Sequence, residues 1–248
     1  MLKGLVIFDI DGVVRDVSKS YRRAIADTVE HYTKGEYRPS MAEIDSLKAE
    51  GFWNNDWKAS QEFIKRWDEE IAVDYDELVN FFQLKYRGNN FDGYITEEPL
   101  LMNMTYLDGL SDNNFGWGFF SGAMRGSAEF ILKKRLGLTE PVLVAMEDAP
   151  EKPDPTGLFQ AIAQLESPEN EGLPVAYVGD TAADMKVIGK AAEQQPTRQW
   201  CAIGVIPPHA RTGDDKEYLY ASNLQDVGAD IVLPSVTEIT PQILSALL

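Results

Sequence analysis

The stretch Gly4-Leu5-Val6-Ile7-Phe8-Asp9-Ile10-Asp11-Gly12 decides the fold of this chain. Its first half is a short, β-rich apolar run, which is typical of a strand buried in a parallel sheet. Asp9 and Asp11 follow where this strand ends, and alternation along an extended chain places both on one side. Ligands bind at this carboxyl edge of parallel sheets. An ordinary turn would explain Asp11 and Gly12, but not Asp9, whose buried carboxylate requires a counter-charge.

Other short apolar runs predict the remaining strands of the same sheet. These strands are Gly116–Phe120, Val142–Met146, Val175–Val178, Ala202–Ile206 and Ile231–Leu233. Helical patterns lie between or after them, at Gly126–Leu136, Thr156–Leu165, Ala182–Gln194 and Thr240–Leu248. Strands that alternate with helices indicate right-handed βαβ units. The sequence therefore predicts an α/β fold, a Rossmann-like doubly wound parallel sheet.

One long interval interrupts this alternation. Between about residues 16 and 97 the sequence shows no convincing strand, and aromatic and charged residues recur at helical spacing. The helices expected there are Tyr21–Tyr32, Met41–Ala49, Ala59–Glu70 and Tyr75–Tyr86. We therefore expect an inserted α-helical cap domain at 16–96 and a core domain formed by 1–15 and 97–248.

Composition limits the classes of function. The 248 residues are 44% hydrophobic, as in soluble globular proteins. No apolar run approaches the roughly 18 residues of a membrane helix, and the apolar start is too short for a signal peptide, so we expect a cytoplasmic protein. The single cysteine, Cys201, excludes an internal disulfide and a cysteine-based metal site.

The charge balance points to the kind of partner. Asp and Glu number 40 against 23 Lys and Arg, which gives a net charge of -17. Such a field repels nucleic acid and anionic membrane surfaces, so we expect neither as a partner. The field also repels phosphorylated substrates at long range. An anion site in this chain must therefore be built locally from a metal, a lysine and backbone N–H groups.

A second acidic motif, Gly179-Asp180-Thr181-Ala182-Ala183-Asp184, has the same shape as the first. An apolar strand precedes it and a helix follows. Taken alone, Asp180 would be explained as a helix N-cap with an acidic first turn. Beside the first motif, the two strand ends together offer four carboxylates. Magnesium suits them, because it prefers oxygen ligands and binds substrate phosphate.

Two further motifs supply groups that suit an anion. Phe119-Phe120-Ser121-Gly122 places a hydroxyl and a glycine at a strand end, where they can form a phosphate cradle, although Ser121 is equally suited to be a helix N-cap. Glu151-Lys152-Pro153-Asp154-Pro155 places one lysine between prolines that fix the backbone. A surface loop is the alternative for Lys152, and a rigidly held ammonium is the functional interpretation.

These four motifs, in this order, resemble those of the haloacid dehalogenase superfamily of phosphohydrolases. Asp9 and Asp11 match the D-x-D-G signature, Ser121 the hydroxyl motif, Lys152 the K-P-x-P lysine motif, and Asp180 with Asp184 the G-D-x-x-x-D motif. The resemblance covers about 1–15 and 97–248. The helical insert after the first motif is similar to that of the branch that includes phosphoglycolate phosphatases.

The resemblance implies a Mg²⁺-dependent phosphatase of a small phosphorylated metabolite. Magnesium would be bound by the carboxylates of Asp9 and Asp180 and the main-chain carbonyl of Asp11. Asp9 is the expected nucleophile, and Asp11 the expected acid and base, which requires its pKa to be raised by anionic neighbours. Substrate phosphate would be held by Ser121 and the Gly122 N–H. Lys152 would offset charge, and Asp184 would orient Lys152 or a metal-bound water.

Several alternatives stay open at this point. A phosphotransferase such as a sugar phosphomutase would share every core residue, and a non-enzymatic, phospho-accepting signalling module would share the aspartate, hydroxyl, lysine and magnesium. A carbon–halogen hydrolase suits the metal aspartates less well. The segment 51–57 is rich in Trp and Asn and could face substrate, although packing of Trp53 and Trp57 inside the cap is favoured. Arg15 and Arg125 are expected at the surface, and the chain as a monomer or homodimer.

Overall fold

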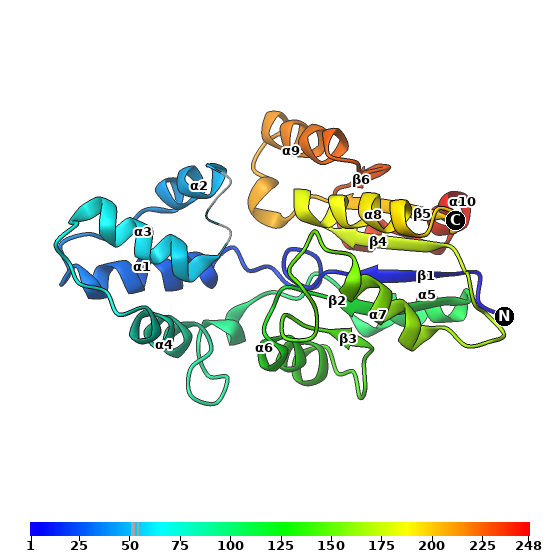
Figure 1. The fold of residues 1–248 in the computed structure, drawn as a ribbon, viewed down its shortest axis with the longest axis horizontal. Helices are drawn as coiled ribbons and strands as arrows, with labels where there is room; N and C mark the ends of the chain where they lie inside the picture. Colours follow the sequence, from blue (N-terminus) through cyan, green and yellow to red (C-terminus); the bar gives the residue numbers. More distant parts are fainter. Residues whose placement is uncertain (51–52, 54) are drawn as a thin grey trace. The chain divides into compact units, whose positions relative to one another are not determined.

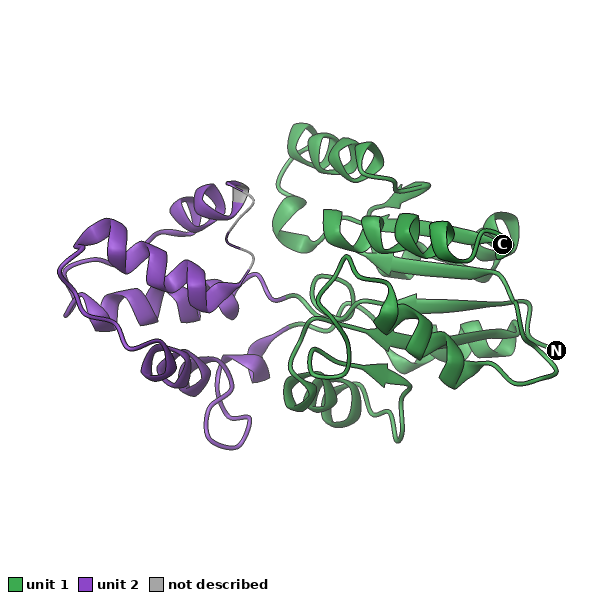
Figure 2. Ribbon diagram, viewed as in Figure 1, with its two compact units in different colours: residues 1–16, 99–248 green, residues 17–98 purple. Residues whose placement is uncertain are grey.

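The computed structural model describes residues 1–50, 53 and 55–248. The chain divides into two compact units, shown in Figure 2. Unit 1 comprises residues 1–16 and 99–248, and unit 2 comprises residues 17–98. The role of unit 2 as a cap stays a prediction.

Unit 1 is built on a six-stranded parallel sheet with the order β3-β2-β1-β4-β5-β6 (Figure 1). The strands are β1 Gly4–Phe8, β2 Phe115–Phe120, β3 Leu143–Val144, β4 Val175–Gly179, β5 Trp200–Val205 and β6 Ile231–Leu233. The order reverses beside β1, so that β2 and β4 flank it. In doubly wound sheets, ligands bind at this switch point, beyond the carboxyl ends of the strands. This confirms the predicted fold class.

Strand β3 is shorter than the predicted Val142–Met146. The N–H of Ala145 does not continue the ladder, because it donates to a side-chain oxygen, Asp148 Oδ2, at 2.7 Å. The N–H of Met146 turns back to the carbonyl of Ala123 at 3.0 Å. The ladder at this edge of the sheet therefore ends after two residues.

Helices cover both faces of this sheet, as a doubly wound fold requires. On one face, apolar residues of α7 Thr156–Leu165, α8 Ala182–Gln194 and α9 Asp214–Asp226 share a core with Leu5, Ile7 and Tyr177. On the other face, Tyr106 of α5 Met104–Asp112 packs edge-on against Phe8, with ring centroids 6.2 Å apart. The remaining elements of unit 1 are α6 Arg125–Glu129, the π-helical turn Phe130–Arg135, α10 Pro241–Leu247 and the 3-10 turns Pro208–Ala210 (η3) and Val236–Glu238 (η4).

The regular secondary structure in the described residues of unit 2 is helical, with α1 Tyr21–Tyr32, α2 Met41–Ala49, α3 Asp56–Trp67, α4 Tyr75–Tyr86 and the 3-10 turn Tyr94–Glu97 (η1). Its core forms where α3 and α4 pack on α1, and Tyr21 stacks on Tyr86 with ring centroids 4.3 Å apart. Helix α3 begins before the predicted Ala59, because the Asn55 side chain accepts the N–H groups of Trp57 and Lys58.

Part of the Trp- and Asn-rich segment of unit 2, namely Gly51, Phe52 and Asn54, lies outside the described residues. Within the described part, the Trp53 indole N–H donates to a carboxylate oxygen of Glu50 at 2.9 Å. Trp53 and Trp57 are both half-buried. Across the described chain, no helix has the length and apolar composition needed to cross a bilayer.

Candidate active site

Asp9 directly follows strand β1 and lies at the carboxyl edge of the sheet. The Asp9 N–H donates to the carbonyl of Val178 at 2.8 Å, which ties Asp9 to the neighbouring strand β4. Its side chain is buried, with 6% of the residue exposed. The chain then turns at Gly12, which has a φ of 75°. Asp9 therefore lies at the reversal of the strand order, where a doubly wound sheet binds its ligand.

Strand β4 delivers Asp180 to the same edge. Thr181, rather than Asp180, is the N-cap of α8, and Asp184 completes a capping box with it. The Asp180 side chain is therefore not the cap of this helix. A Cβ built on Gly12 would lie 2.0 Å from Asp180 Oδ2. Only a glycine lets the two loops approach this closely.

Lys152 joins the two acidic motifs. Its ammonium nitrogen lies 2.9 Å from Asp9 Oδ1 and 2.8 Å from Asp184 Oδ1. The ring centroids of Phe120 and Tyr177 lie 5.0 and 5.4 Å from the same nitrogen. A lysine so enclosed is held in place as a fixed positive charge.

Both carboxylate oxygens of Asp184 accept hydrogen bonds from neighbouring residues. Its Oδ1 accepts from Lys152 and, at 3.1 Å, from the Tyr177 hydroxyl. Its Oδ2 accepts from the Thr181 N–H at 3.0 Å and from the Thr181 hydroxyl. These bonds fix Asp184, and through it they fix Lys152.

Ser121 and Gly122 follow strand β2 at the same edge. Ser121 is buried, and its hydroxyl oxygen accepts the N–H of Ala123 at 3.1 Å. Ser121 is thus not the N-cap of α6, which begins at Arg125. Gly122 is exposed, and a Cβ built on it would meet no described atom within 4 Å. The backbone at Gly122 is open to an approaching anion.

Asp11 has a partner that the sequence analysis did not find. Arg15, expected at the surface, is fully buried, and its Nη2 lies 2.6 Å from Asp11 Oδ1. The available signal was the four-residue spacing of opposite charges in a short apolar loop. Arg125 is 41% exposed and pairs with Asp148 instead.

Burial and crowding of like charges shift the pKa values of this cluster. Burial raises the pKa of Asp9 to about 7, with Lys152 opposing and the charges of Asp184 and Asp11 adding to the rise. The pKa of Asp180 is raised well above its usual value by burial and by the nearby carboxylates of Asp184 and Asp9. Burial would also raise the pKa of Asp184, but the charge and hydrogen bond of Lys152 outweigh it and the pKa is lowered. Negative charge at Asp9 and Asp180 is therefore incompletely compensated.

These residues fit a hard divalent cation. Carboxylate oxygens of Asp9, Asp180 and Asp184 lie within 4.8 Å of one another. Asp9 Oδ1 is buried and accepts no hydrogen bond from the described residues. Its one polar contact among them is the ion pair with Lys152. Oxygen ligands at this spacing suit magnesium, and a cation there would relieve the like-charge repulsion.

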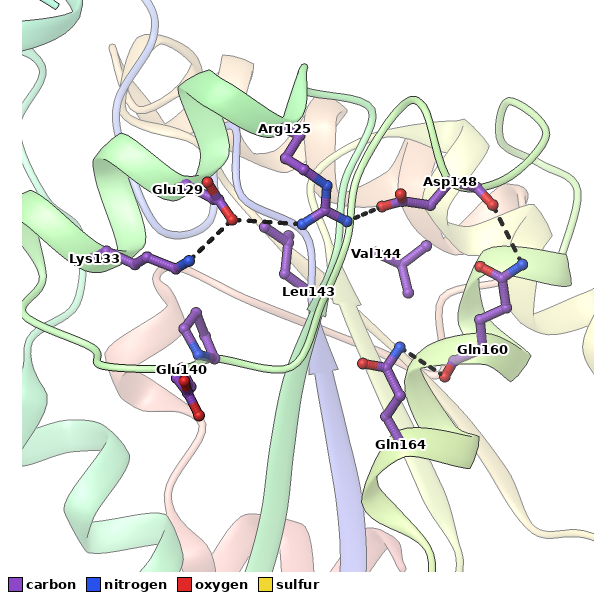
Figure 3. A pocket seen from close by; sticks show the side chains of 10 residues that line it. Arg125, Glu129, Lys133, Glu140, Leu143, Val144, Asp148, Gln160 and Gln164 are labelled. Atoms are coloured by element: carbon purple, nitrogen blue, oxygen red, sulfur yellow. Dashed lines mark hydrogen bonds and ion pairs between the residues drawn. The ribbon is translucent and has the colours of Figure 1, made fainter.

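A separate surface pocket of about 400 Å³ lies beside the edge strand β3 (Figure 3). Arg125, Glu129, Lys133 and Asp148 line it and form ion pairs with one another. None of the predicted site residues lines this pocket. It is a surface depression in which these four charged side chains pair with one another, and it is distinct from the carboxyl-edge cluster.

Known proteins resemble this chain along nearly its whole length. A curated imidazoleglycerol-phosphate dehydratase from Phytophthora nicotianae is 29% identical over 236 residues. The match covers 92% of this chain and 49% of that protein, so the chain spans about half the length of this curated relative.

Solved structures show the same fold. A hydrolase from Pseudomonas syringae has a TM-score of 0.65 and 18% identity, with 95% of each chain covered. A predicted phosphoglycolate phosphatase from Haemophilus somnus 129pt has a TM-score of 0.68 and 14% identity, with 96% of each chain covered. A HAD family hydrolase from Deinococcus radiodurans R1, with bound phosphate and sodium, has a TM-score of 0.67 and 16% identity, covering 100% of this chain and 97% of that one.

The family model described as haloacid dehalogenase-like hydrolase matches residues 4–192. This range includes both acidic motifs, the lysine and the inserted unit. The chain therefore belongs to the haloacid dehalogenase-like hydrolases.

Proposed function

We propose that this protein is a magnesium-dependent phosphatase that uses Asp9 as the nucleophile on a small phosphorylated metabolite. The observation that carries the proposal is the position of the Lys152 ammonium, 2.9 Å from Asp9 and 2.8 Å from Asp184. Attack of one anion on another is limited by electrostatics, which positioning and local positive charge overcome. The cluster supplies a nucleophile, a fixed cation and carboxylates suited to a metal at one edge of the sheet.

Magnesium would be held by the carboxylates of Asp9 and Asp180 and by the main-chain carbonyl of Asp11. When bound, it supplies positive charge that neutralises phosphate oxygens and positions them for in-line displacement. Asp184, whose oxygens are occupied by Lys152, Tyr177 and Thr181, serves instead to orient Lys152. The family membership and the acidic cluster both support this assignment.

The reaction divides into two displacements at phosphorus. In the first, an Asp9 oxygen forms a bond to phosphorus while the ester bond breaks, and Asp11 donates a proton to the leaving alcohol. In the second, water attacks the aspartyl phosphate and gives a proton to Asp11. The bond between Asp9 and phosphorus breaks, which releases inorganic phosphate and restores both carboxyl groups.

The phosphoryl group would be bound by residues at the end of strand β2 and by Lys152. Ser121 is buried at this edge and Gly122 is open. We infer that the Ser121 hydroxyl and the Gly122 N–H hold phosphate oxygens, as polar groups at strand ends do in anion sites. The ammonium of Lys152 offsets the charge that remains.

Unit 2 is inserted directly after the loop that carries Asp9 and Asp11. We propose that it acts as a cap that selects the leaving group, in a cytoplasmic enzyme that works as a monomer or homodimer. A phosphotransferase, such as a sugar phosphomutase, would use the same core residues. A putative β-phosphoglucomutase from Thermotoga maritima shares the fold, with a TM-score of 0.65 and 15% identity.

The test is a screen of phosphorylated metabolites that measures released inorganic phosphate, with magnesium and with EDTA. Sugar phosphates, phosphoglycolate-like acids, small alcohol phosphates and imidazoleglycerol phosphate belong in the panel, the last because of the curated relative. Phosphate release that EDTA abolishes and magnesium restores is the expected result. Chelator-insensitive release would refute the metal assignment. Transfer of phosphate between sugar positions without release would favour the mutase, and stable phosphorylation without turnover of any ester would favour a signalling module.

A further inference from the structure

Arg15 lies in the loop that carries Asp9 and Asp11, and it has no part in the two proposed displacements. It is the largest fully buried side chain among the described residues. Its Nε and Nη2 atoms lie 2.7 and 2.6 Å from one and the same oxygen, Oδ1 of Asp11. Burial of a guanidinium is unfavourable unless an ion pair offsets the lost hydration. A buried cation on the expected acid and base therefore calls for an explanation.

Backbone hydrogen bonds and a β-bridge hold the main chain of Arg15 in place. The N–H of Gly12 donates to the carbonyl of Arg15 at 2.9 Å, which closes the loop on itself. Arg15 also forms a β-bridge to Leu100, and the N–H of Leu101 donates to the carbonyl of Val14 at 2.8 Å. All these residues belong to unit 1. The guanidinium thus reaches Asp11 from a segment that is held on two sides.

The two carboxylate oxygens of Asp11 differ in their contacts with Arg15. Both donors reach Oδ1, which leaves Oδ2 outside the pair. The Asp11 side chain is 29% exposed, whereas that of Arg15 is fully buried. Oδ1 accepts the hydrogen bond of Nε and pairs with Nη2 at 2.6 Å, so the guanidinium occupies this oxygen. A proton that Asp11 transfers is therefore carried by Oδ2.

We propose that Arg15 is a positioning residue, which holds the Asp11 carboxyl so that Oδ2 gives its proton to the leaving oxygen and then accepts one from the attacking water. The inference rests on the proposed function, in which Asp11 is the general acid and base. Arg15 itself touches neither substrate nor phosphorus in this account. Its effect on the leaving group passes through Asp11.

A positioning role makes the effect of Arg15 depend on the leaving group. An alkyl phosphate releases a basic alkoxide, which needs a proton as its bond to phosphorus breaks. The 4-nitrophenolate ion leaves without one. If Asp11 is no longer held in place, hydrolysis of the alkyl ester therefore becomes slower, while hydrolysis of the aryl ester keeps its rate. If the whole site is distorted, hydrolysis of both esters becomes slower. The ratio kcat/KM reports this difference cleanly, because it includes only steps up to loss of the alcohol.

The experiment compares the full-length wild type with Arg15→Lys and Arg15→Met on glycerol phosphate and 4-nitrophenyl phosphate. General acid catalysis contributes about 10²–10⁴-fold, so we expect losses of at least about 10-fold on the alkyl ester and under about 3-fold on the aryl ester. Arg22→Lys is the matched control, because Arg22 also places Nε and Nη2 on one oxygen, Asp45 Oδ1, at 2.9 and 2.6 Å. It should leave both ratios unchanged. Equal losses on the two esters would overturn the inference.

A second comparison covers the case in which both Arg15 variants fail to fold, as judged by circular dichroism and thermal melting. Residues that act only through each other are not additive. The double variant Asp11→Asn/Arg15→Gln should therefore match Asp11→Asn alone on both esters. A further loss, equal on the two esters, would contradict the inference. A wild type that releases phosphate from no ester of the metabolite panel would refute the proposed function and this inference together, whereas equal losses in an active enzyme refute the inference alone.

Discussion

The ammonium of Lys152 lies 2.9 Å from Oδ1 of Asp9, and their side chains are 10% and 9% exposed. This pair joins the first strand to a loop far along the chain. Burial acts to lower the pKa of Lys152, but the charges of Asp184 and Asp9 outweigh it and raise the pKa, so the lysine stays protonated at neutral pH. A permanent positive charge therefore sits beside the proposed nucleophile.

Replacement of that charge should remove both activity and stability. Lys152→Met leaves the carboxylates of Asp9 and Asp184 buried without their cation, which costs about 3–5 kcal/mol for broken buried pairs. Phosphatase activity should fall by at least about 10²-fold, since fixed electrostatic groups of this kind contribute on that order. The assays are phosphate release and thermal melting. Lys133→Met is the control, because Lys133 forms an exposed pair with Glu129, and its activity should stay at the wild-type level. An active Lys152→Met variant would contradict the assigned role.

Metal-free protein should lose stability through Asp9 and Asp180 as the pH rises. Both carboxyls have a pKa above the unfolded value, near 7 for Asp9. The folded state therefore binds more protons between about pH 4 and pH 7, and stability falls with pH in that window. Asp184, whose pKa is lowered, acts the opposite way and loses its contribution only at acid pH. Magnesium should restore stability above about pH 7, because it binds the ionised carboxylates.

The variant Asp180→Asn isolates this effect. It removes one crowded carboxylate, so its melting temperature in EDTA should exceed that of the wild type by an amount that grows from about pH 5 to about pH 8. Added magnesium should stabilise the wild type and leave Asp180→Asn almost unchanged. Differential scanning fluorimetry measures both. A difference between the two proteins that shrinks as the pH rises would contradict the raised pKa of Asp180.

The glycine of the first motif is required by geometry. In Gly12→Ala, the new Cβ would lie 2.0 Å from Asp180 Oδ2 at a φ of 75°. The substitution should therefore destabilise the fold and weaken magnesium binding, because Asp180 must move. Gly137→Ala is the matched control, with a φ of 91° and no described atom within 4 Å. It should show only the backbone strain of about 1–3 kcal/mol, with magnesium affinity unchanged in a calorimetric titration. Equal magnesium affinity in the two variants would show that the contact with Asp180 is unimportant.

The strands and helices that flank the site could be predicted from sequence because their signals are local. Strand β1 and helices α7 and α8 have the predicted bounds. Their apolar runs, together with the proline before Thr156 and the threonine before Ala182, mark both type and ends. The four motifs follow from the same signals, because each occurs where a strand ends.

The elements that were missed have weak local signals. Helix α5 contains Gly109, a poor helix former. Helix α9 buries only Leu224 and leaves Tyr218 and Leu219 exposed, so it shows no apolar stripe. The predicted helix Gly126–Leu136 starts as α6 and widens into a π-turn at Phe130, which periodicity does not reveal.

The details of the site depend on tertiary contacts. The burial of Arg15 and its pairing with Asp11 follow from a loop closure and a bridge to Leu100, which lies far away in sequence. Likewise, Thr181 replaces Asp180 as the helix cap, a choice that depends on backbone angles. Sequence reasoning could name the candidate side chains at the carboxyl edge, but not which of their atoms contact one another.

The most direct test of this account is rapid-quench labelling with a ³²P-phosphorylated substrate, followed by mapping of the labelled residue. The wild type should yield an acid-stable, alkali-labile phosphate on Asp9 within a single turnover, and Asp9→Asn should yield neither label nor turnover. Label on another residue, or full activity in Asp9→Asn, would contradict the central claim that Asp9 attacks phosphorus.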